Sequence, residues 1–343
     1  MLKITFKNVG QGDSIILEWS EEMQDAQQML KKRIGIIDCN LHQGKNPVLL
    51  HIIQENYREI EFLLLSHPHD DHFSGFLELL EYLETNNIKI KIFYHTSQQV
   101  PEFLKTACNS TTATKNLNNL FRKLRADDKK DKYVLQYINS FSPPIKFGNA
   151  FEMQCLSPSS REENDYPKSN TNHYDTDNEG NNPKANLLST VFKITQNTKE
   201  SGVNSFILLT SDVPKTVLER LGKKEAESLT GLLTLGQSPH HGAKSNHYSA
   251  FWRNLNVKKG CFAVFSVGEN QYKHPSQEAV DFFADSFQIR YTNKIGVLNQ
   301  ITTKTPKTTP LKNIQNNLNM ITFVVDNGKD CIFEFENGTI QEK

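Results

Sequence analysis

Ser66-His67-Pro68-His69-Asp70-Asp71-His72 is the stretch that decides how this 343-residue sequence is interpreted. It follows an apolar run typical of a buried strand and precedes apolar residues at helical spacing. On such a strand-to-helix turn His67 and His69 can point to one side. Asp71 and His72 can then reach a second point nearby. Because imidazoles and carboxylates are ligands for zinc, manganese or iron, we predict a metal-ligand cluster here. The alternative is a polar loop that merely contains histidines.

Two later segments supply further candidate ligands. The apolar run 206–209 leads into Thr210-Ser211-Asp212, where Asp212 is either a ligand or the N-cap of a helix that starts at Pro214. The segment Ser238-Pro239-His240-His241-Gly242 follows a weakly apolar run. One of its two histidines can bind a metal while the other contacts the substrate, and the residues alone leave that choice open.

Hydrophobic periodicity divides the rest of the chain into strands and helices. The predicted strands are 2–8, 14–19, 33–38, 61–66, 89–95, 151–156, 187–194, 205–209 and 261–267, with a closing hairpin of 320–325 and 330–335 around Asn327-Gly328. The predicted helices are 73–83, 214–221 and 277–283, with a helical pattern over 101–138. A long polar loop is expected over about 159–186.

The order of these elements predicts an α/β fold. Strands and helices are mixed without strict βαβ alternation, which favours two mixed β-sheets with helices on the outside. No segment has the composition of a linker between domains. Residues 1–343 are therefore expected to form a single domain that carries the polar loop as an insert.

The charge balance limits the kinds of partner. The chain has 39 Lys and Arg residues against 39 Asp and Glu residues, so its formal charge is zero. Domains that bind nucleic acid through bulk electrostatics are usually strongly basic, and this chain is not. A local basic groove from the four cations Lys244, Arg253, Lys258 and Lys273 remains compatible with the sequence, but scattered solvated charges are the favoured interpretation of them.

Cysteine usage and hydropathy point to the expected compartment. The five cysteines are scattered and form no Cys-x-x-Cys pair, which argues against a disulfide framework or a thiolate zinc site and fits a reducing compartment. No apolar run approaches the ~18 residues that span a bilayer. We therefore expect a cytoplasmic protein without a membrane partner.

Taken in order, these motifs resemble a known family. A His-x-His-x-Asp-His segment after a buried strand, then a strand ending in Asp, then a later His, is similar to the ligand order of the metallo-β-lactamase superfamily. Finer segments look like the hydrolase domain of ComEC-type DNA-uptake proteins, and phosphorylcholine esterase-like enzymes share much of the pattern. These segments are 8–14, 36–38, 208–212, 239–242, and 266–268 with 274–275. The resemblance covers about residues 1–283 and implies an αββα sandwich.

The resemblance also implies roles for individual residues. His67 and His69 would bind one metal, Asp71 and His72 the other, and Asp212 would bridge them. The last ligand would be His240, with His241 facing the substrate, although these two roles can be exchanged. His274 would lie at the rim and donate a hydrogen bond or a proton to the leaving group. Asp38 would orient the ligand loop, and Asp71 or Asp212 would hold the attacking water.

One position departs from most of the superfamily. Asn186 stands where a histidine ligand is usual, a feature that ComEC-type relatives tend to share. It leaves the metal at His67 and His69 short of one strong ligand, which His95 or His173 can supply.

The implied activity is hydrolysis with two divalent metal ions, zinc in the first place and manganese or iron as alternatives. The preferred substrate is a phosphodiester, either a single-stranded nucleic acid or a nucleotide. A second hypothesis is another ester: phosphocholine-type, cyclic nucleotide, thioester or lactam. A third is a catalytically silent metal-binding interaction module.

Overall fold

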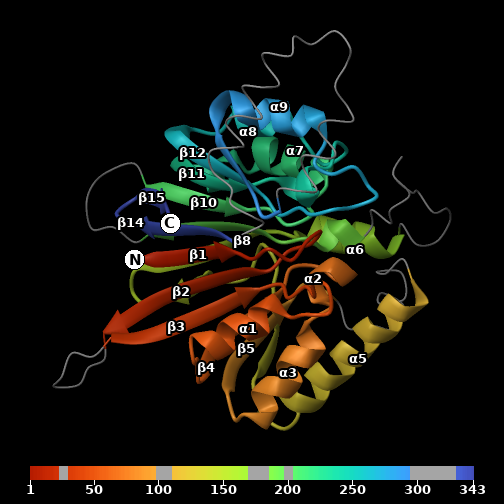
Figure 1. The fold of residues 1–343 in the computed structure, drawn as a ribbon. Coiled ribbons are helices and arrows are strands. Elements are labelled where there is room, and N and C mark those ends of the chain that lie inside the picture. The colour runs from red at the N-terminus through yellow and green to blue at the C-terminus, as the bar shows by residue number, and fades with distance from the viewer. Residues whose placement is uncertain (23–29, 98–109, 169–184, 197–203, 294–329) are drawn as a thin grey trace.

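The computed structural model describes residues 1–22, 30–97, 110–168, 185–196, 204–293 and 330–343. Their strands form two mixed β-sheets that pack face to face, and helices cover both outer faces (Figure 1). The predicted αββα sandwich is confirmed. Among these residues, no helix is both long and apolar enough to cross a membrane.

The first sheet carries the ligand loop. Within the described residues its order is β15-β14-β1-β2-β3-β4-β5-β6, and β3 to β6 run parallel to one another. Parallel neighbours end at the same edge of a sheet, so the residues after β3, β4 and β5 lie close together there. The bounds are β1 Leu2–Phe6, β2 Ile15–Glu22, β3 Leu30–Ile37, β4 Glu59–Leu65, β5 Lys89–His95, β6 Val134–Tyr137, β14 Cys331–Glu336 and β15 Thr339–Glu342.

The second sheet carries the later candidate ligands. Its order within the same residues is β13-β12-β11-β10-β9-β8-β7, with β10 to β13 parallel. The segments after β10, β11 and β12 therefore also share one edge. The bounds are β7 Ile145–Phe147, β8 Phe151–Ser157, β9 Val191–Gln196, β10 Ser205–Leu209, β11 Leu232–Gln237, β12 Val257–Phe265 and β13 Gln288–Tyr291.

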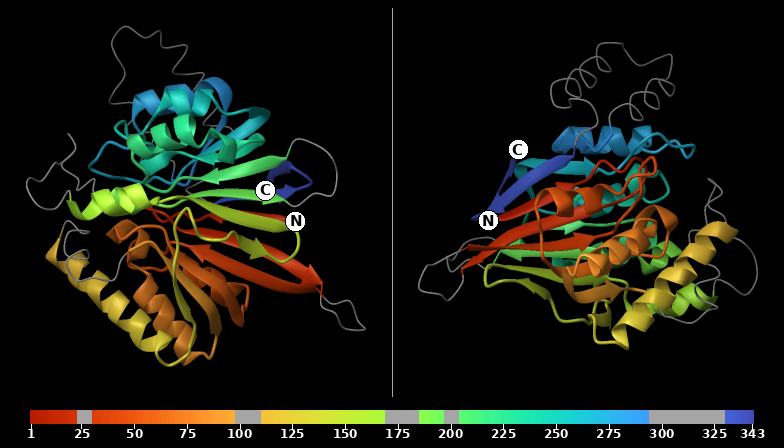
Figure 2. Two further views of the ribbon diagram at one scale, coloured as in Figure 1. Left: turned by 180° about the vertical axis from the view of Figure 1, so that it is seen from behind. Right: turned by 60° about the horizontal axis from the view of Figure 1, so that its bottom comes forward.

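The helices lie on opposite sides of the paired sheets (Figure 2). Those beside the first sheet are α1 Pro47–Gln54, α2 Asp70–Phe73, α3 Phe76–Thr85 and α5 Thr111–Asp128. Those beside the second are α7 Lys215–Lys224, α8 Ser249–Arg253 and α9 Gln277–Ser286, while α6 Ser160–Lys168 lies at the edge between the layers. Short 3₁₀ turns are η1 Ala185–Leu188, η2 Ala226–Leu229 and η3 Pro239–Gly242.

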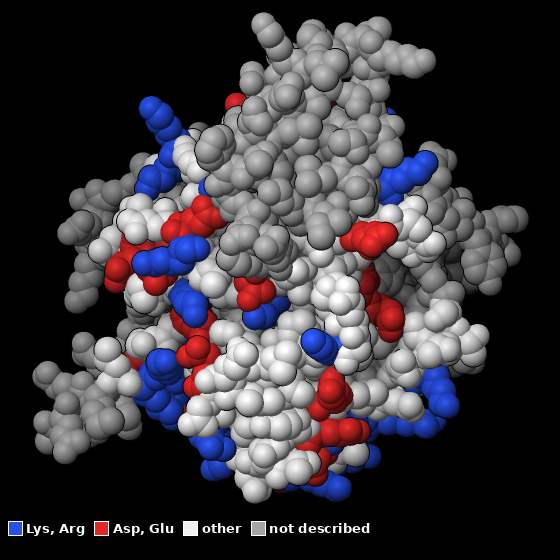
Figure 3. All heavy atoms as spheres, in the orientation of Figure 1, with Lys and Arg blue, Asp and Glu red and all other residues white. Residues whose placement is uncertain are grey.

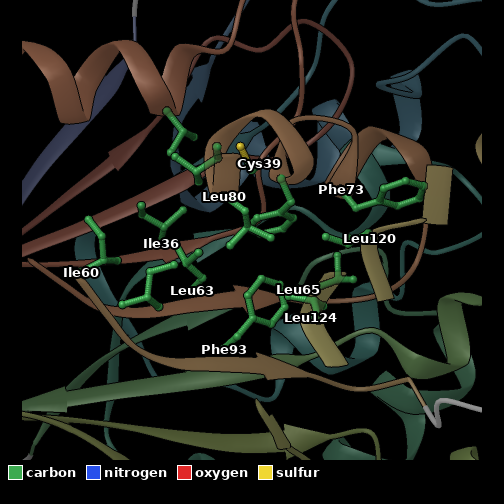
Figure 4. Packing of buried hydrophobic residues seen from close by; sticks show 14 of the residues in the cluster. Ile36, Cys39, Ile60, Leu63, Leu65, Phe73, Leu80, Phe93, Leu120 and Leu124 are labelled. Carbon is green, nitrogen blue, oxygen red and sulfur yellow. The ribbon is translucent and has the colours of Figure 1, made fainter. Parts of the chain in front are cut away.

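Buried apolar residues form three clusters that match these layers. One joins the first sheet to α1, α3 and α5, with side chains such as Leu63, Leu80 and Leu120 in its interior (Figure 4). The second fills the space between the sheets, and the third joins the second sheet to α7, α8 and α9. Each buried Leu, Ile or Phe contributes about 1.5–3 kcal/mol, so the edge that carries the candidate ligands rests on a packed scaffold.

Several predicted elements are corrected. The helix predicted over 73–83 begins at α2, breaks at Ser74-Gly75 and continues as α3. The helical pattern over 101–138 is wrong at its end, because β6 pairs with β5 there. The closing hairpin is β14–β15, which turns at Asn337-Gly338, while 320–325 lies outside the described residues.

The polar loop over 159–186 is also corrected in part. Residues Ser160–Lys168 form α6, and Ala185–Leu188 form η1, while 169–184 lie outside the described residues. The carboxylate of Glu162 accepts a hydrogen bond from the backbone N–H of Ser159. This is one arm of a capping box, in which Ser is followed three residues later by Glu, and it explains why a polar segment starts a helix.

Candidate metal centre

The ligand loop of the first sheet meets the loops of the second sheet at the shared edge. Ser66, directly after β4, places its Oγ 2.8 Å from the Oγ of Ser211, which lies just after β10. The backbone N–H of Thr190 donates to the carbonyl of Ser66, and that of His240 donates to the carbonyl of Ser211. Residues about 145 positions apart are thus held against each other.

The structure brings all six predicted metal ligands into this region, together with His241, which the resemblance placed beside the substrate. Three groups in the described residues have ligand atoms within 4.8 Å of one another. One is Asp13 with Asp38 and His72. The other two, which we call the ligand groups, are His67 with His69 and Asp212, and Asp71 with His72, Asp212 and His241. Asp212 belongs to both ligand groups, which is the arrangement expected of a carboxylate that bridges two cations.

Asp212 faces the imidazoles with both of its oxygens. Its Oδ2 lies 3.7 Å from Nε2 of His67, and its Oδ1 lies 3.5 Å from Nε2 of His72. The Nε2 of His241 lies 3.4 Å from Oδ1 of Asp212 and 3.3 Å from Oδ2 of Asp71. These separations leave room for cations between the atoms.

The unpaired atoms of this region fit a metal centre. Six buried ligand atoms have no hydrogen-bond partner among the described residues: Nε2 of His67, His69, His72 and His241, and both carboxylate oxygens of Asp212. A buried polar atom without a partner costs about 1–3 kcal/mol, so six that converge need a common partner. A pair of divalent cations satisfies imidazole nitrogens and carboxylate oxygens together.

Burial and the neighbouring carboxylates shift the pKa values of the histidines in opposite directions. Burial lowers the pKa of His69 to about 4 and that of His67 well below its ordinary value. Both rings are therefore neutral at pH 7, the form that binds metals. For His241, burial opposes the charged form, but the carboxylates of Asp212 and Asp71 outweigh it and raise the pKa.

Asp38 orients the ligand loop, as the sequence predicts. Its Oδ1 accepts a hydrogen bond of 2.8 Å from the backbone N–H of Ser66, and its Oδ2 lies 2.7 Å from Nδ1 of His72. Contact at Nδ1 turns the opposite nitrogen, Nε2, toward Asp212. A carboxylate behind a ligating histidine fixes its ring and raises its basicity.

The turn between β1 and β2 packs directly on the ligand loop. Gly12 has a φ of +127°, and a Cβ there would overlap the carbonyl oxygen of Asp71 and the amide of Asn40. The backbone N–H of Asp13 donates to that same carbonyl at 3.1 Å. The close approach of this turn to the ligand loop therefore requires a glycine at position 12.

The two adjacent histidines of η3 have different surroundings. The Nδ1 of His241 lies 2.7 Å from the carbonyl of Ser266, which directs Nε2 toward the ligands. The Nδ1 of His240 lies 2.9 Å from Oδ1 of Asn246, and its Nε2 lies 3.5 Å from Asp212. His240 falls in neither ligand group, so the placement favours the exchanged assignment, with His241 as ligand and His240 beside the substrate.

Two other predicted participants, His274 and His95, are buried. The ring of His274 is buried 5.2 Å from that of His240, and burial lowers its pKa to about 2, which suits a neutral hydrogen-bond donor rather than an acid. His95 is buried against the rings of Phe121 and Tyr137 and belongs to neither ligand group in the described residues. His173 lies outside those residues. Asn186 is buried, and its side-chain oxygen has no hydrogen-bond partner within the part of the chain that the structure describes.

The cations considered for a basic groove have intramolecular contacts. Lys244 pairs with Glu278 at 3.3 Å, Arg253 lies over the ring of Phe282, and Lys258 donates to the carbonyl of Gly338. The face shown in Figure 3 carries positive and negative side chains side by side. Scattered charges, the favoured interpretation, agree with these contacts.

Sequence reasoning missed the polar residues that support Asp212. The amide of Asn246 donates to the carbonyls of Asp212 and Val213 at 3.2 and 3.1 Å. The amide oxygen of Gln237 accepts from the backbone N–H groups of Thr210 and Ser211. The sequence offered one signal of such a role: Gln237 is a polar residue at the end of an otherwise apolar strand.

Comparison of the sequence with protein-family models finds no match, and comparison with curated proteins finds none either. Solved structures do match. Unliganded yeast PDE1 has 12% identity and a TM-score of 0.47 over 85% of this chain and 97% of that one. The metallo-β-lactamase fold protein YhfI from Bacillus subtilis has 11% identity and a TM-score of 0.42 over 84% and 95%. A long form of RNase Z from yeast has 11% identity and a TM-score of 0.42 over 80% of this chain and 38% of that one. This chain therefore spans less than half the length of that RNase Z.

Proposed function

We propose that this protein is a metal-dependent hydrolase of the metallo-β-lactamase superfamily that cleaves phosphodiesters. The supporting observation is the convergence of six unpaired, buried ligand atoms on both sides of Asp212. The resemblance of the five sequence motifs to hydrolases of that superfamily agrees with it.

The residues divide into two candidate metal sites. His67, His69 and Asp212 would hold one cation, and Asp71, His72 and His241 would hold the other together with Asp212. Zinc suits this donor set, and manganese or iron are the alternatives. When bound, two divalent cations supply Lewis acidity and a coordinated water of lowered pKa.

The remaining polar residues would act on the substrate. His240 lies beside Asp212, and His274 lies beside His240. His274, held neutral by burial, would donate a hydrogen bond to a substrate oxygen and orient the scissile group. The carboxylate of Asp71, whose side chain is 34% exposed, would orient the attacking water.

A phosphodiester fits because its non-bridging oxygens carry the negative charge that such a site stabilises. A single-stranded nucleic acid or a nucleotide is the preferred form of this substrate, on the ComEC-type resemblance. Other esters and a silent binding module are the competing functions.

The test is hydrolysis by the metal-loaded protein of a panel containing single-stranded DNA, RNA, a cyclic nucleotide, a small aryl phosphodiester, a thioester and a lactam. We expect turnover of a phosphodiester, and its loss in His69→Ala. His51→Gln is the matched control, because His51 contacts Glu18 rather than the candidate ligands.

Each outcome separates the candidate functions. Turnover of nucleic acid but not of the small diester selects the nuclease, and the reverse selects a small-substrate phosphodiesterase. Turnover restricted to the thioester or lactam contradicts the proposed substrate class. Bound metal without turnover of any substrate favours the silent module, and full activity of His69→Ala contradicts the proposed site.

A further inference from the structure

Two buried side chains lie between the halves of the candidate metal centre. One half is the ligand loop after β4, and the other is the segment that leads from β10 to Asp212. Gln237 is the last residue of β11, and Asp13 lies in the turn between β1 and β2. Their exposed fractions are 2% and 1%, so neither is solvated.

These side chains form a continuous path of hydrogen bonds between the two halves. The Oε1 of Gln237 accepts from the backbone N–H groups of Thr210 and Ser211, each at 3.0 Å. The Nε2 of Gln237 donates to Oδ2 of Asp13 at 2.8 Å. The backbone N–H of Asp13 then donates to the carbonyl of Asp71 at 3.1 Å. We call this path the Gln237–Asp13 strap.

The chemistry of an amide gives the strap a single orientation. The oxygen of Gln237 must face the two N–H donors, and its nitrogen must face the carboxylate of Asp13, because the reverse would leave three buried groups unpaired. Ser211 has a φ of +46°, a left-handed conformation that L residues rarely adopt. The strap therefore holds a strained segment directly before Asp212.

We propose that Gln237 and Asp13 are positioning residues, which set the separation between Asp212 and Asp71 so that both can bind the same pair of cations. This inference rests on the proposed function, since it presupposes the metal centre. Ligands must be held within about 0.5 Å of their productive geometry, and fixing the backbone on both sides of the centre does this.

The first test variant is Gln237→Glu. It keeps an acceptor for the N–H groups of Thr210 and Ser211 but sets a second carboxylate against Asp13. If only charge mattered, the added carboxylate would strengthen cation binding. The strap predicts the opposite, a loss of about 10–100-fold in the affinity for Zn²⁺ or Co²⁺, the range found for residues that orient ligands.

A second variant restores the strap with its polarity reversed. In the double variant Asp13→Asn/Gln237→Glu, an amide at position 13 donates to a carboxylate at position 237, and the net charge equals that of the wild type. Asp13→Asn alone still offers an acceptor to Gln237. We expect the metal affinity of the double variant to equal that of Asp13→Asn alone within about twofold. A twofold difference is roughly the margin within which the effects of independent substitutions usually add.

The experiment measures Zn²⁺ and Co²⁺ affinity by competition with a chelator on the full chain. Melting of the metal-free protein checks the fold of each variant. Gln154→Glu is the control, because Gln154 is an exposed residue of β8 and its substitution adds the same charge. Weaker binding in Gln237→Glu with recovery in the double variant supports the strap.

Three results overturn it. One is Gln237→Glu binding metal as tightly as the wild type or more tightly. Another is a double variant that folds but binds metal much more weakly than Asp13→Asn alone. This comparison also tests the strap if Gln237→Glu alone fails to fold. The third is a wild type that binds no metal. That result overturns the proposed function as well, and it differs from the first two because in them the wild type does bind metal.

Discussion

Asp212 has its two carboxylate oxygens directed at different imidazoles, with His67 on one side and His72 and His241 on the other. Although burial raises the pKa of a carboxyl group, the imidazoles of His241 and His240 outweigh it and hold the pKa of Asp212 well below its usual range. The surroundings of Asp212 therefore favour its anionic form, as a bridging ligand requires.

Asp212→Asn should abolish turnover more severely than any neighbouring change. The amide offers a single neutral oxygen, so both metal sites lose a charged ligand. A loss of several kcal/mol of transition-state stabilisation corresponds to about 10³-fold in kcat/KM. The control is Asp70→Asn in the adjacent loop, which lies outside both ligand groups. Equal losses in the two variants would contradict the assigned role.

His240 and His241 should separate metal content from turnover. His241→Ala is expected to lower the bound metal toward one equivalent, because it removes a member of the four-residue group. His240→Ala is expected to keep the metal and lose activity, because His240 falls in neither ligand group. Metal analysis of both purified variants checks this. The opposite pattern would restore the original assignment of His240 as the ligand.

At the scale of single residues, the sequence predicted candidate ligands where several residues of ligand type lie close together in the chain. His67, His69 and His72 fall within six positions, and no fold is needed to see them as candidate ligands. Gln237 and Asn246 are single polar residues whose partners lie far away in the chain, so only the tertiary structure connects them to Asp212.

The turn between β1 and β2 links element geometry to the site. We expect Gly12→Ala to lower the melting temperature and the metal affinity together, because the new Cβ would displace the backbone of Asp71. Gly44→Ala is the control: Gly44 also has a positive φ, +72°, but a Cβ there meets nothing within 4 Å. That variant should show only the backbone strain of about 1–2 kcal/mol. Equal effects of the two variants would show that contact with Asp71 is unimportant.

A buried carboxylate joins α1 to the first sheet. Glu18 of β2 accepts a hydrogen bond from Tyr57 at 2.8 Å, lies 3.1 Å from Nε2 of His51 and pairs with Lys3 at 2.8 Å. Burial alone would raise its pKa, but His51, Lys3 and Tyr57 together lower it from 4.5 to about 2. Glu18 therefore stabilises the fold above pH 4.5, and this contribution is lost as the pH falls toward 2.

Glu18→Gln should flatten that acid dependence. Between pH 5 and pH 2 the wild type should lose about 1–2 kcal/mol more of its free energy of unfolding than the variant, after allowance for solvent screening. Urea titrations at a series of pH values measure the difference. A wild type and a variant that weaken in parallel over this range would contradict the assignment.

Elements were predicted best where a strand is buried along its whole length and forms a continuous apolar run. β10, at 205–209, is fully buried and was predicted with its observed bounds. α6 was missed because its polar composition looks like a loop, and its start depends on the capping contact between Ser159 and Glu162. The turn at 337–338 was missed because Asn327-Gly328 offers the same local signal, and only pairing with β14 distinguishes them.

In the whole molecule, the candidate centre lies where the two sheets meet. Its ligands come from the ends of β4, β10 and β11. The side chains of β4 belong to the first and second clusters, and those of β10 and β11 belong to the second and third. The order of the ligands in the sequence predicted this convergence, whereas a single domain over 1–343 stays a prediction.

Because the centre joins the two sheets, its cations should stabilise the entire fold. Removing metal with a chelator should lower the free energy of unfolding by about 2.7 kcal/mol relative to protein kept at 100 times the dissociation constant. Thermal melting with and without chelator measures this, and His51→Gln should show the same difference. A melting temperature unchanged by the chelator in protein shown to have bound metal would mean that the cations do not bridge the sheets.

The most direct measurement is the number of divalent cations bound per chain, determined by calorimetric titration of metal-free protein with Zn²⁺. We predict about two per chain in the wild type and in Asp70→Asn, with fewer in Asp212→Asn. A wild type that binds none, or an Asp212→Asn variant that binds as many as the wild type, would contradict this prediction.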